Sequence, residues 1–401
     1  MAPSSPTAGG RRRNHLPLEA FLVSVLVFLV LGALAIIPWG FKAFDPIKEV
    51  LNDFSYTDVY YTKISREARV DTSIVLINIG RADRRALADL VEAVGAAHPR
   101  AMGLDAYFLA RPDAGTARLA KVLKAQPRLV VGEYLTEPAG SPASAFNLPP
   151  TQRGYLNFVG NDSLNTTVRY FRPFLETADR RYTSWSAQLL RLADPAAFAA
   201  LQSRQQDRET IRYQGDLSRF IAYEGAAVTA GAVPPAALKG KIIILGFLGE
   251  PMGTRTSLED LHFTPLNAKQ LGRSLPDMYG PVIQANILSM MLHRDYITPT
   301  PRWGELLLAF GVCYLHVMLF MYLYVHYLLW YHPLTTVIQF VSGAVLVYFM
   351  IQLFVGASVG LGVVLPVLTM ILAVDVLCLY EALAAWLYRK RGIRSYIIHA
   401  H

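Results

Sequence analysis

The chain has 401 residues, of which 53% are hydrophobic and only 17% charged, and its formal net charge is +8. A soluble protein carries a charged fraction of about a quarter, and the apolar residues here form uninterrupted blocks, so the composition excludes an ordinary soluble protein. The basic excess forms no stripe interleaved with aromatic residues, which argues against nucleic acid as a partner. Both cysteines, Cys313 and Cys378, fall in apolar blocks, so the remaining sequence has neither a disulfide nor a cysteine-based metal site.

Four apolar segments are long enough to cross a membrane. The first, 18–39, lacks a small-residue cleavage site, which favours an uncleaved signal anchor over a cleaved signal peptide. The other three occupy 305–331, 334–355 and 363–387. The turns between these last three segments are short, so they predict a tight antiparallel set of helices.

Basic residues predict the orientation of these segments. Arginines occur in the tail 1–17 and basic residues again in the tail 388–401, and four spans place both tails on the same side. Because basic tails favour the cytoplasm, both termini are predicted to be cytoplasmic and residues 40–302 extracytoplasmic. The sequence therefore predicts a multi-pass protein of the bacterial cytoplasmic (inner) membrane, surrounded by membrane lipid.

The region 40–302 predicts a mixed α/β domain. Ile47, Val50, Leu51 and Phe54 have helical spacing and predict an amphipathic helix after the first span. Beyond it, β-branched or apolar runs of strand length alternate with helical patterns: strands at 72–80, 101–108 and 128–135, and helices at 81–98 and at 114–125, the latter capped by Asp113. This βαβαβ order predicts a largely parallel sheet with flanking helices.

The second half of the domain continues with shorter elements. The patterns predict strands at 154–160, 168–174 and 241–249, and helices at 185–201, capped by Ser184, and at 280–293. The segments 210–215 and 219–225 predict a β-hairpin. The fold class is therefore an α/β domain inserted between one N-terminal and three C-terminal transmembrane helices.

Several motifs occur in a recognisable order. They are the strands TSIVLINIG and MGLDAYF, a segment with Gly154, Asn157, Arg169 and Arg172, the Asp260–Thr264–Pro265 pattern, and the helix with Gly280, Gln284, Ala285 and Asn286. In this order, between one and three membrane helices, they resemble the CHASE2 family of extracytoplasmic sensory domains of bacterial receptors. The chain departs from that pattern at Asn78, where the family usually has an acidic residue, and at Asn165-Thr166, where it usually has Asp-Gly. Only 14 residues follow Leu387, too few for the fused effector that such receptors usually carry.

The resemblance and the strand ends give candidate ligand-binding residues: Asp105, Asn157, Arg169, Asp260, Thr264 and Asn286. Open α/β sheets bind ligands at the carboxyl ends of their strands, where Asp105 is expected. The alternative for Asp105 is a cap on a backbone turn, and for Asp260 with Thr264 a structural turn. The histidines His98 and His262 are isolated, so no metal site is predicted. No catalytic motif and no cofactor motif is present, so an enzyme is not expected.

A second group of candidates is a polar cluster inside the membrane. Asp375 lies 14 residues before Arg389, which is roughly 21 Å along a helix, and a carboxylate at that depth is expected to be paired or protonated. His316 is predicted to lie at a similar depth and to meet Asp375, and His326 to meet Glu381 nearer the cytoplasm. The alternative is that these groups only hold helices together.

These observations predict a non-enzymatic sensor or assembly subunit that couples a CHASE2-like domain to a separate effector or complex. Its partners are expected to be other membrane or cytoplasmic proteins, or further copies of itself, and its ligand is unknown. The alternatives are a structural scaffold of an envelope complex and, resting only on the polar cluster, ion or proton translocation.

Overall fold

The structure, a computed structural model, describes residues 15–36, 61, 70–109, 113–135, 146–158, 167–177, 180–255, 260–267, 275–393 and 395–398. The chain divides into two compact units: Glu49–Ile297, and Met1–Lys48 together with Thr298–His401. The amphipathic helix predicted from Ile47 to Phe54 and the turn at Asn165-Thr166 lie outside the described residues.

The unit Glu49–Ile297 is built on a six-stranded sheet with the order β4-β3-β2-β10-β1-β9. All five strand pairs are parallel, as the βαβαβ order predicts. The strands are β1 (Asp71–Asn78), β2 (Ala101–Asp105), β3 (Leu129–Glu133), β4 (Arg153–Tyr155), β9 (Phe220–Glu224) and β10 (Ile242–Gly246).

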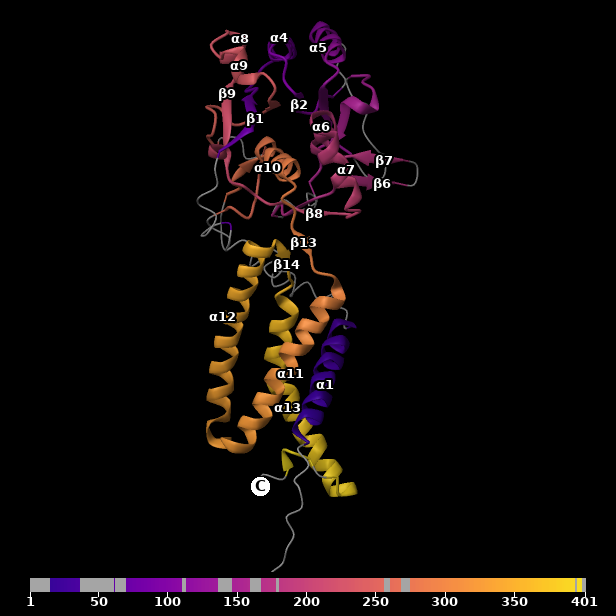
Figure 1. Ribbon diagram of the computed structural model, residues 1–401, viewed down its shortest axis with the longest axis vertical. Helices are drawn as coiled ribbons and strands as arrows, with labels where there is room; N and C mark the ends of the chain where they lie inside the picture. The colour runs from indigo at the N-terminus through magenta and orange to yellow at the C-terminus, as the bar shows by residue number, and fades with distance from the viewer. Residues whose placement is uncertain are drawn as a thin grey trace, which may run out of the picture. The chain divides into compact units, whose positions relative to one another are not determined.

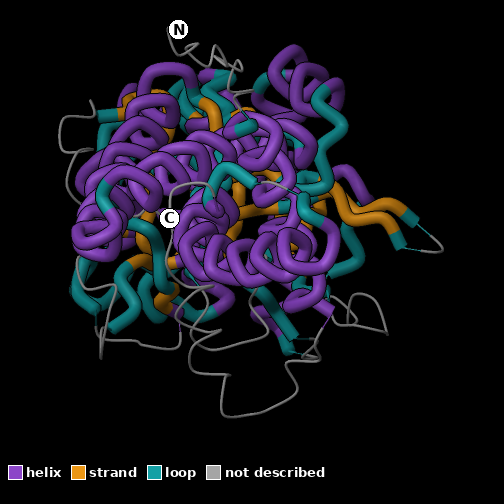
Figure 2. The backbone as a smooth tube through the Cα atoms, turned by 90° about the horizontal axis from the view of Figure 1, so that it is seen from below, coloured by secondary structure: helices purple, strands orange, loops and turns teal. Residues whose placement is uncertain are grey.

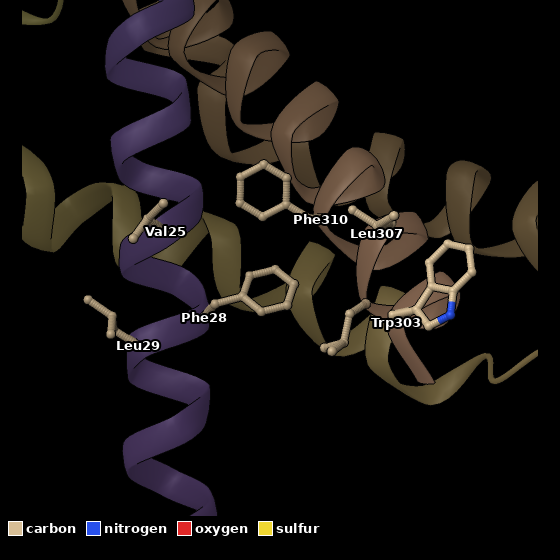
Figure 3. A pocket seen from close by; sticks show the side chains of 7 residues that line it. Val25, Phe28, Leu29, Trp303, Leu307 and Phe310 are labelled. Atoms are coloured by element: carbon tan, nitrogen blue, oxygen red, sulfur yellow. The ribbon is translucent and has the colours of Figure 1, made fainter. Parts of the chain in front are cut away.

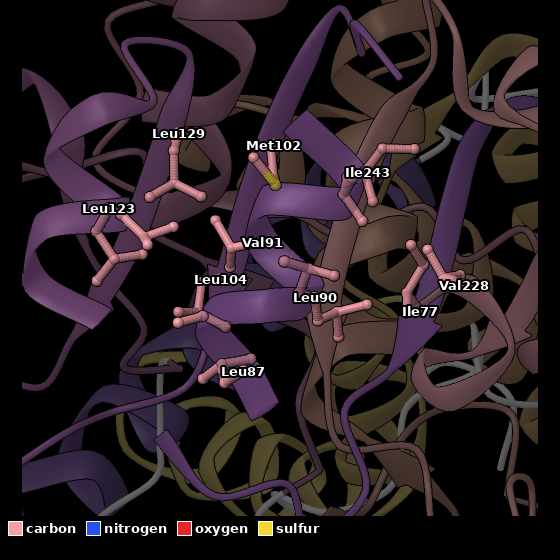
Figure 4. Packing of buried hydrophobic residues seen from close by; sticks show 14 of the residues in the cluster. Ile77, Leu87, Leu90, Val91, Met102, Leu104, Leu123, Leu129, Val228 and Ile243 are labelled. Carbon is pink, nitrogen blue, oxygen red and sulfur yellow. The ribbon is translucent and has the colours of Figure 1, made fainter. Parts of the chain in front are cut away.

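Helices cover both faces of this sheet (Figure 1). On one face lie α4 (Arg84–Ala96), α5 (Ala114–Ala125), α8 (Gly225–Thr229) and α9 (Pro235–Leu238); on the other lie α6 (Trp185–Ala193) and α10 (Gly280–His293). Figure 4 shows Leu87, Leu90 and Val91 of α4 against the strand residues Met102 and Leu104. Since helices pack on both sides, β1 is buried on both faces, which explains its unbroken apolar run.

Close packing depends on glycine at one point of this sheet. A Cβ at Gly103 of β2 would lie 2.2 Å from the ring of Trp185, which is 0% exposed. The indole Nε1 of Trp185 donates a hydrogen bond to the carbonyl of Val130, 3.3 Å away. The first residue of α6 therefore fills the space that Gly103 leaves, and Ser184 caps the helix as predicted.

Two predictions in this unit are wrong. The predicted helix 185–201 is two helices, α6 and α7 (Pro195–Ser203), because Pro195 has no N–H to continue the first and Asp194 caps the second. The predicted hairpin does not form. Strand β8 (Glu209–Thr210) pairs with β5 (Tyr170–Phe171), while β9 joins the free edge of β1.

Short two-stranded sheets complete the unit. They are β6 (Phe174–Glu176) with β7 (Arg181–Thr183), and β11 (Leu261–His262) with β12 (Met278–Tyr279). Figures 1 and 2 both show the β6–β7 pair projecting from the rest of its unit. The 3₁₀ turns η2 (Pro150–Gln152) and η3 (Leu217–Arg219) precede β4 and β9.

The second unit is a set of helices long and apolar enough to cross a membrane: α1 (Leu16–Ile36), α11 (Arg302–His326), η5 (Leu328–Trp330) with α12 (Tyr331–Ala357), and α13 (Val364–Arg391). The expected arrangement of one N-terminal and three C-terminal helices is confirmed. Helices α1, α11 and α13 pack against one another, and α12 packs beside α11 and α13 (Figure 1). Outside the helices, β13 (Thr298–Pro299) pairs with β14 (Val359–Gly360).

Candidate functional site

A row of residues marks the carboxyl end of the parallel sheet. The strand register places Glu224 of β9 beside Asn78 of β1, Asn78 beside Gly246 of β10, and Gly246 beside Asp105 of β2. Three of these four residues are polar although the strands that carry them are apolar. This edge of the sheet therefore carries polar side chains that could contact a ligand, whereas the rest of the strands forms the apolar core.

Asn78 is fully engaged at this edge. Its amide nitrogen donates to Glu224 Oε2 and to the carbonyl of Gly249, each at 2.9 Å. Its amide oxygen accepts from the backbone N–H of Leu248 at 2.9 Å and of Gly80 at 3.2 Å. A carboxylate could accept but not donate these bonds, so asparagine at this position holds the loops in place.

Asp105 has the opposite character. Its Oδ2 is buried and has no hydrogen-bond partner among the residues that the structure describes. A buried polar atom without a partner is uncommon and costly in folded proteins. Neighbouring Gly246 gives it room, since a Cβ there would lie 2.4 Å from the ring of Pro281 and 3.4 Å from the Cβ of Asp105.

Two further side chains converge with Asp105 on the start of α10. A Cβ placed on Gly280 would lie 3.8 Å from Asp105 Oδ2, 3.9 Å from His262 Nε2 and 4.0 Å from the ring of Phe158. The rings of Phe158 and His262 meet edge to face with centroids 5.0 Å apart. The side chain of Tyr279, the residue before α10, does not cap the helix; its hydroxyl donates to the carbonyl of Thr254 at 2.7 Å. The carboxyl, imidazole and phenyl groups thus surround one point in front of α10.

Two tyrosines lie just beyond the carboxyl ends of β2 and β3. Tyr107 follows β2 and Tyr134 follows β3, and their rings meet edge to face at 5.8 Å. The hydroxyl of Tyr107 is also buried without a hydrogen-bond partner among the described residues. Tyr134 is 37% exposed, so it lies at the rim of the site.

The electrostatics tie Asp105 to Asp260. Burial, and then the charge of Asp260, raise the pKa of Asp105 from 3.8 to about 7. Burial, and then Asp105 and Asp260, raise the pKa of Tyr134. Burial lowers the pKa of His262, which keeps the imidazole neutral. Among the described residues, Asp105 thus has an acidic neighbour and no basic side chain that lowers its pKa.

The other predicted ligand residues hold backbone instead. The side-chain amide of Asn157 binds the backbone of Leu135 twice. Its oxygen accepts from the N–H of Leu135 at 2.8 Å, and its nitrogen donates to the carbonyl of Leu135 at 2.9 Å. Thr264 donates to Asp277 through its hydroxyl at 2.5 Å, as expected for a structural turn. Asn286 accepts from the N–H of Gln214 at 2.6 Å and donates to the carbonyl of Gly215 at 3.0 Å.

Arg169 is 9% exposed and lies close enough to Tyr213 to lower its pKa, although burial dominates and raises that pKa overall. Of the six predicted residues, the structure therefore brings together Asp105 and Asp260. Sequence reasoning missed Tyr107, Tyr134, Phe158 and His262. The position of Tyr107 and Tyr134 at the carboxyl ends of the predicted strands 101–108 and 128–135 was the available signal.

The family model of the CHASE2 domain matches residues 24–319. The chain belongs to the CHASE2 family. No curated protein and no solved structure matches this CHASE2 chain significantly. Together with the four apolar helices, the family match fits a membrane sensor.

The helices of the CHASE2 chain hold their polar groups differently from the prediction. His316 and Asp375 do not meet: His316 Nδ1 donates to the carbonyl of Val312 at 2.8 Å, and its Nε2 lies 2.8 Å from Ser342 Oγ. His326 and Glu381 do not meet either: His326 donates to the carbonyl of Tyr322, while Glu381 accepts from Tyr324 at 2.6 Å. Both predicted pairs are wrong, because carbonyls of α11 itself and the hydroxyl of Ser342 engage the two histidines, and a tyrosine hydroxyl of α11 engages Glu381.

An unpredicted carboxylate organises the same helices. Glu19 in the first turn of α1 is 6% exposed. It accepts hydrogen bonds from the hydroxyl of Tyr380 at 2.9 Å, the hydroxyl of Ser395 at 2.6 Å and the N–H of Tyr396 at 2.8 Å. Glu19 thus ties α1 to α13 and to the segment after α13. An acidic residue inside an apolar span was the sequence signal for it.

An apolar groove lies between α1 and α11 (Figure 3). Its volume is about 600 Å³, and it is lined by Val25, Phe28, Leu29, Trp303, Leu306, Leu307 and Phe310. The lining presents no charged group to orient a polar ligand. In a membrane, lipid acyl chains have the chemistry to fill it. For the described residues, no group of three or more His, Cys, Asp or Glu side chains is placed to hold a metal ion.

Proposed function

We propose that this CHASE2 protein is a non-enzymatic sensor of the bacterial inner membrane. Its α/β domain binds a small organic cation at the Asp105 edge, and its helices pass the signal to a separate effector. The observation that carries this proposal is the Oδ2 of Asp105, which is buried at the carboxyl end of the sheet without a hydrogen-bond partner among the described residues.

The chemistry of the edge favours a cation. A positively charged ligand group would pair with the carboxylate of Asp105 and offset its repulsion by Asp260. Tyr107, Tyr134 and Phe158 are aromatic residues of the kind whose ring faces surround ammonium groups in proteins. Neutral His262 adds no opposing charge. An amine of modest size therefore suits this site better than an anion.

The helical unit offers a route for the signal. Glu19 joins α1 to Ser395 and Tyr396 beyond α13, so a shift of α1 along or around its axis would change how that segment is held. Arg389, Lys390 and Arg391 in the last turn of α13 support a cytoplasmic position for this end. A partner protein that binds the segment after α13 would then receive the signal on the cytoplasmic side. We expect no nucleic acid among the partners.

The test is ligand-induced stabilisation of the full chain in lipid nanodiscs. A panel of small primary, secondary and quaternary amines is screened by the shift in Tm, because a ligand that binds the folded state stabilises it by mass action. An amine that raises the Tm of the wild type, and of the control variant Asp194→Asn, but not of Asp105→Asn, supports the proposal. No shift from any amine, or an equal shift in Asp105→Asn, contradicts it.

The second candidate function is a structural scaffold of an envelope complex. The observation that favours it lies in the helical unit, where the side chain of Asp375 is exposed on α13. A scaffold requires surfaces that other membrane proteins cover, whereas a sensor requires a ligand. The amine screen separates the two, because a scaffold gives no ligand-dependent shift at the Asp105 edge.

A further inference from the structure

The described transmembrane helices carry four carboxylates away from the basic end of α13: Glu19, Glu305, Asp375 and Glu381. Glu19 accepts three hydrogen bonds, Glu305 accepts one from the N–H of Gly362 at 2.9 Å, and Glu381 accepts one from Tyr324. Asp375 alone of these four has no hydrogen-bond or ion-pair partner among the described residues, and it is exposed. The helices thus satisfy every such carboxylate but one.

Along the axis of α13, Asp375 lies at a level where α13 packs against its neighbouring helices. Four residues before it, the carbonyl of Ile371 accepts a hydrogen bond from Gln339 of α12 at 3.3 Å. Six residues after it, Glu381 accepts from Tyr324 of α11. Asp375 therefore lies between two contacts with neighbouring helices, at a level where lipid tails and not water surround the protein.

The side chain of Asp375 interrupts an otherwise apolar stripe. Residues spaced by three or four positions share one face of a helix. The exposed residues of this face include Leu368 (45%), Ile371 (51%), Leu379 (59%) and Leu383 (47%), with Asp375 at their centre and exposed Cys378 beside it. Lipid alone would cover such a stripe, but a carboxylate facing hydrocarbon is costly and is normally paired. The face therefore fits a helix that is itself apolar except for one complementary group.

We propose that this stripe of α13 is the docking surface for a transmembrane helix of another protein that carries a basic residue at mid-bilayer. Charge complementarity decides between this partner and a second copy of the chain. In the described transmembrane helices, Lys and Arg occur only near the ends, at Arg302 and at Arg389, Lys390 and Arg391, and mid-span His316 is already engaged through both ring nitrogens. A second copy would therefore set a carboxylate against a carboxylate.

The test uses a synthetic leucine-rich transmembrane peptide with one central lysine. The full chain, labelled at its N-terminus, and the labelled peptide are placed together in phosphatidylcholine vesicles, and association is measured by energy transfer. Interhelical polar contacts in bilayers lead us to expect about tenfold tighter association than for the same peptide with leucine at the centre. The variant Asp375→Leu should lose this preference, whereas Phe340→Leu, on the exposed face of α12, should keep it.

Two further comparisons make the outcome decisive. A peptide with a central glutamate should associate no better than the leucine peptide, and helical circular dichroism of Asp375→Leu should match the wild type. Equal association of the lysine and leucine peptides, or an unchanged preference in Asp375→Leu, overturns the proposal. Energy transfer between two differently labelled copies that Asp375→Leu abolishes also overturns it, because a second copy then covers the stripe. This inference deepens the scaffold alternative, but its test uses neither the Asp105 edge nor amines, so the two can fail separately.

Discussion

The sheet edge of the α/β domain and the set of apolar helices share one feature. Each contains a polar side chain that makes several hydrogen bonds and another that makes none to the described residues. At the sheet edge, Asn78 makes four hydrogen bonds, while the Oδ2 of Asp105 makes none to the part of the chain that the structure describes. In the helices, Glu19 accepts three hydrogen bonds, while Asp375 accepts none from any described residue. The satisfied members explain how each unit is held together. The unsatisfied members are where a ligand or a partner helix would add the missing contact.

The largest expected effect comes from Asp105→Asn, which removes the unpaired charge and keeps the shape. In the folded chain the pKa of Asp105 is raised to about 7. Below pH 4 the carboxyl is protonated in both folded and unfolded states, so the substitution changes little. Between pH 4 and 7 only the unfolded state ionises, which lowers wild-type stability as pH rises. At pH 8 the variant should be more stable by on the order of 4 kcal/mol.

Urea unfolding of the full chain in detergent, followed from pH 4 to pH 8, measures this difference. Asp277, whose pKa burial also raises, to about 6, is present in both proteins and cancels in the comparison. A pH-independent difference between variant and wild type would show that Asp105 is not the unpaired charge described here.

Asn286→Leu tests a polar side chain whose hydrogen bonds are all made within the protein, and it should lower stability. The variant leaves the backbone groups of Gln214 and Gly215 without their partner inside the protein. Leaving buried polar groups unsatisfied lowers stability by about 3 kcal/mol, and the same unfolding experiment detects it. A loss below about 1 kcal/mol would mean that water replaces the amide, and that Asn286 is free for another role.

Glu19→Gln sharpens the comparison within the helices. Glutamine keeps an acceptor oxygen but loses the charge that strengthens the bonds from Tyr380, Ser395 and Tyr396. We expect a stability loss of about 1 to 2 kcal/mol. Faster hydrogen exchange at Tyr396 should accompany it, measured by mass spectrometry. Unchanged exchange at Tyr396 would contradict the role of Glu19 in holding this segment.

The smallest effect on stability is expected for Gly280→Ala. The added methyl group would meet its neighbours no closer than 3.8 Å, and alanine in a helix is favoured over glycine by about 0.5 to 1 kcal/mol. The variant should therefore fold at least as well as the wild type. Because the methyl group enters the space in front of Asp105, an amine found in the screen should bind it more weakly. Unchanged affinity would place the ligand elsewhere.

Local patterns were sufficient to predict most elements of the sheet. The apolar runs of β1 and β2 and the cap of α5 by Asp113 depend on neighbours in sequence, and the structure confirms them. The pairing of β9 with β1 could not be predicted in the same way. Their register joins Glu224 to Asn78, which lie far apart in the chain, whereas a hairpin needs only the adjacent segment.

The candidate site was predictable to a similar degree. The rule that ligands bind at the carboxyl ends of parallel strands pointed to Asp105. His262 looked isolated because the groups around it, Phe158 and Gly280, come from distant segments. In the membrane, equal depth suggested that His316 would meet Asp375, but depth does not determine which face of a helix a side chain occupies. The serine at position 342 lay on the facing side, and the carboxylate did not.

The central claim is that a cation meets the carboxyl of Asp105, and proton release tests it most directly. At pH 6 a carboxyl with a pKa of about 7 is mostly protonated, so a cation that pairs with it must displace that proton. Calorimetric titration of the full chain with an amine from the screen, repeated in buffers of different ionisation enthalpy, should show close to one proton released per amine bound. Binding without proton release would mean that the amine does not pair with Asp105, and would contradict the account.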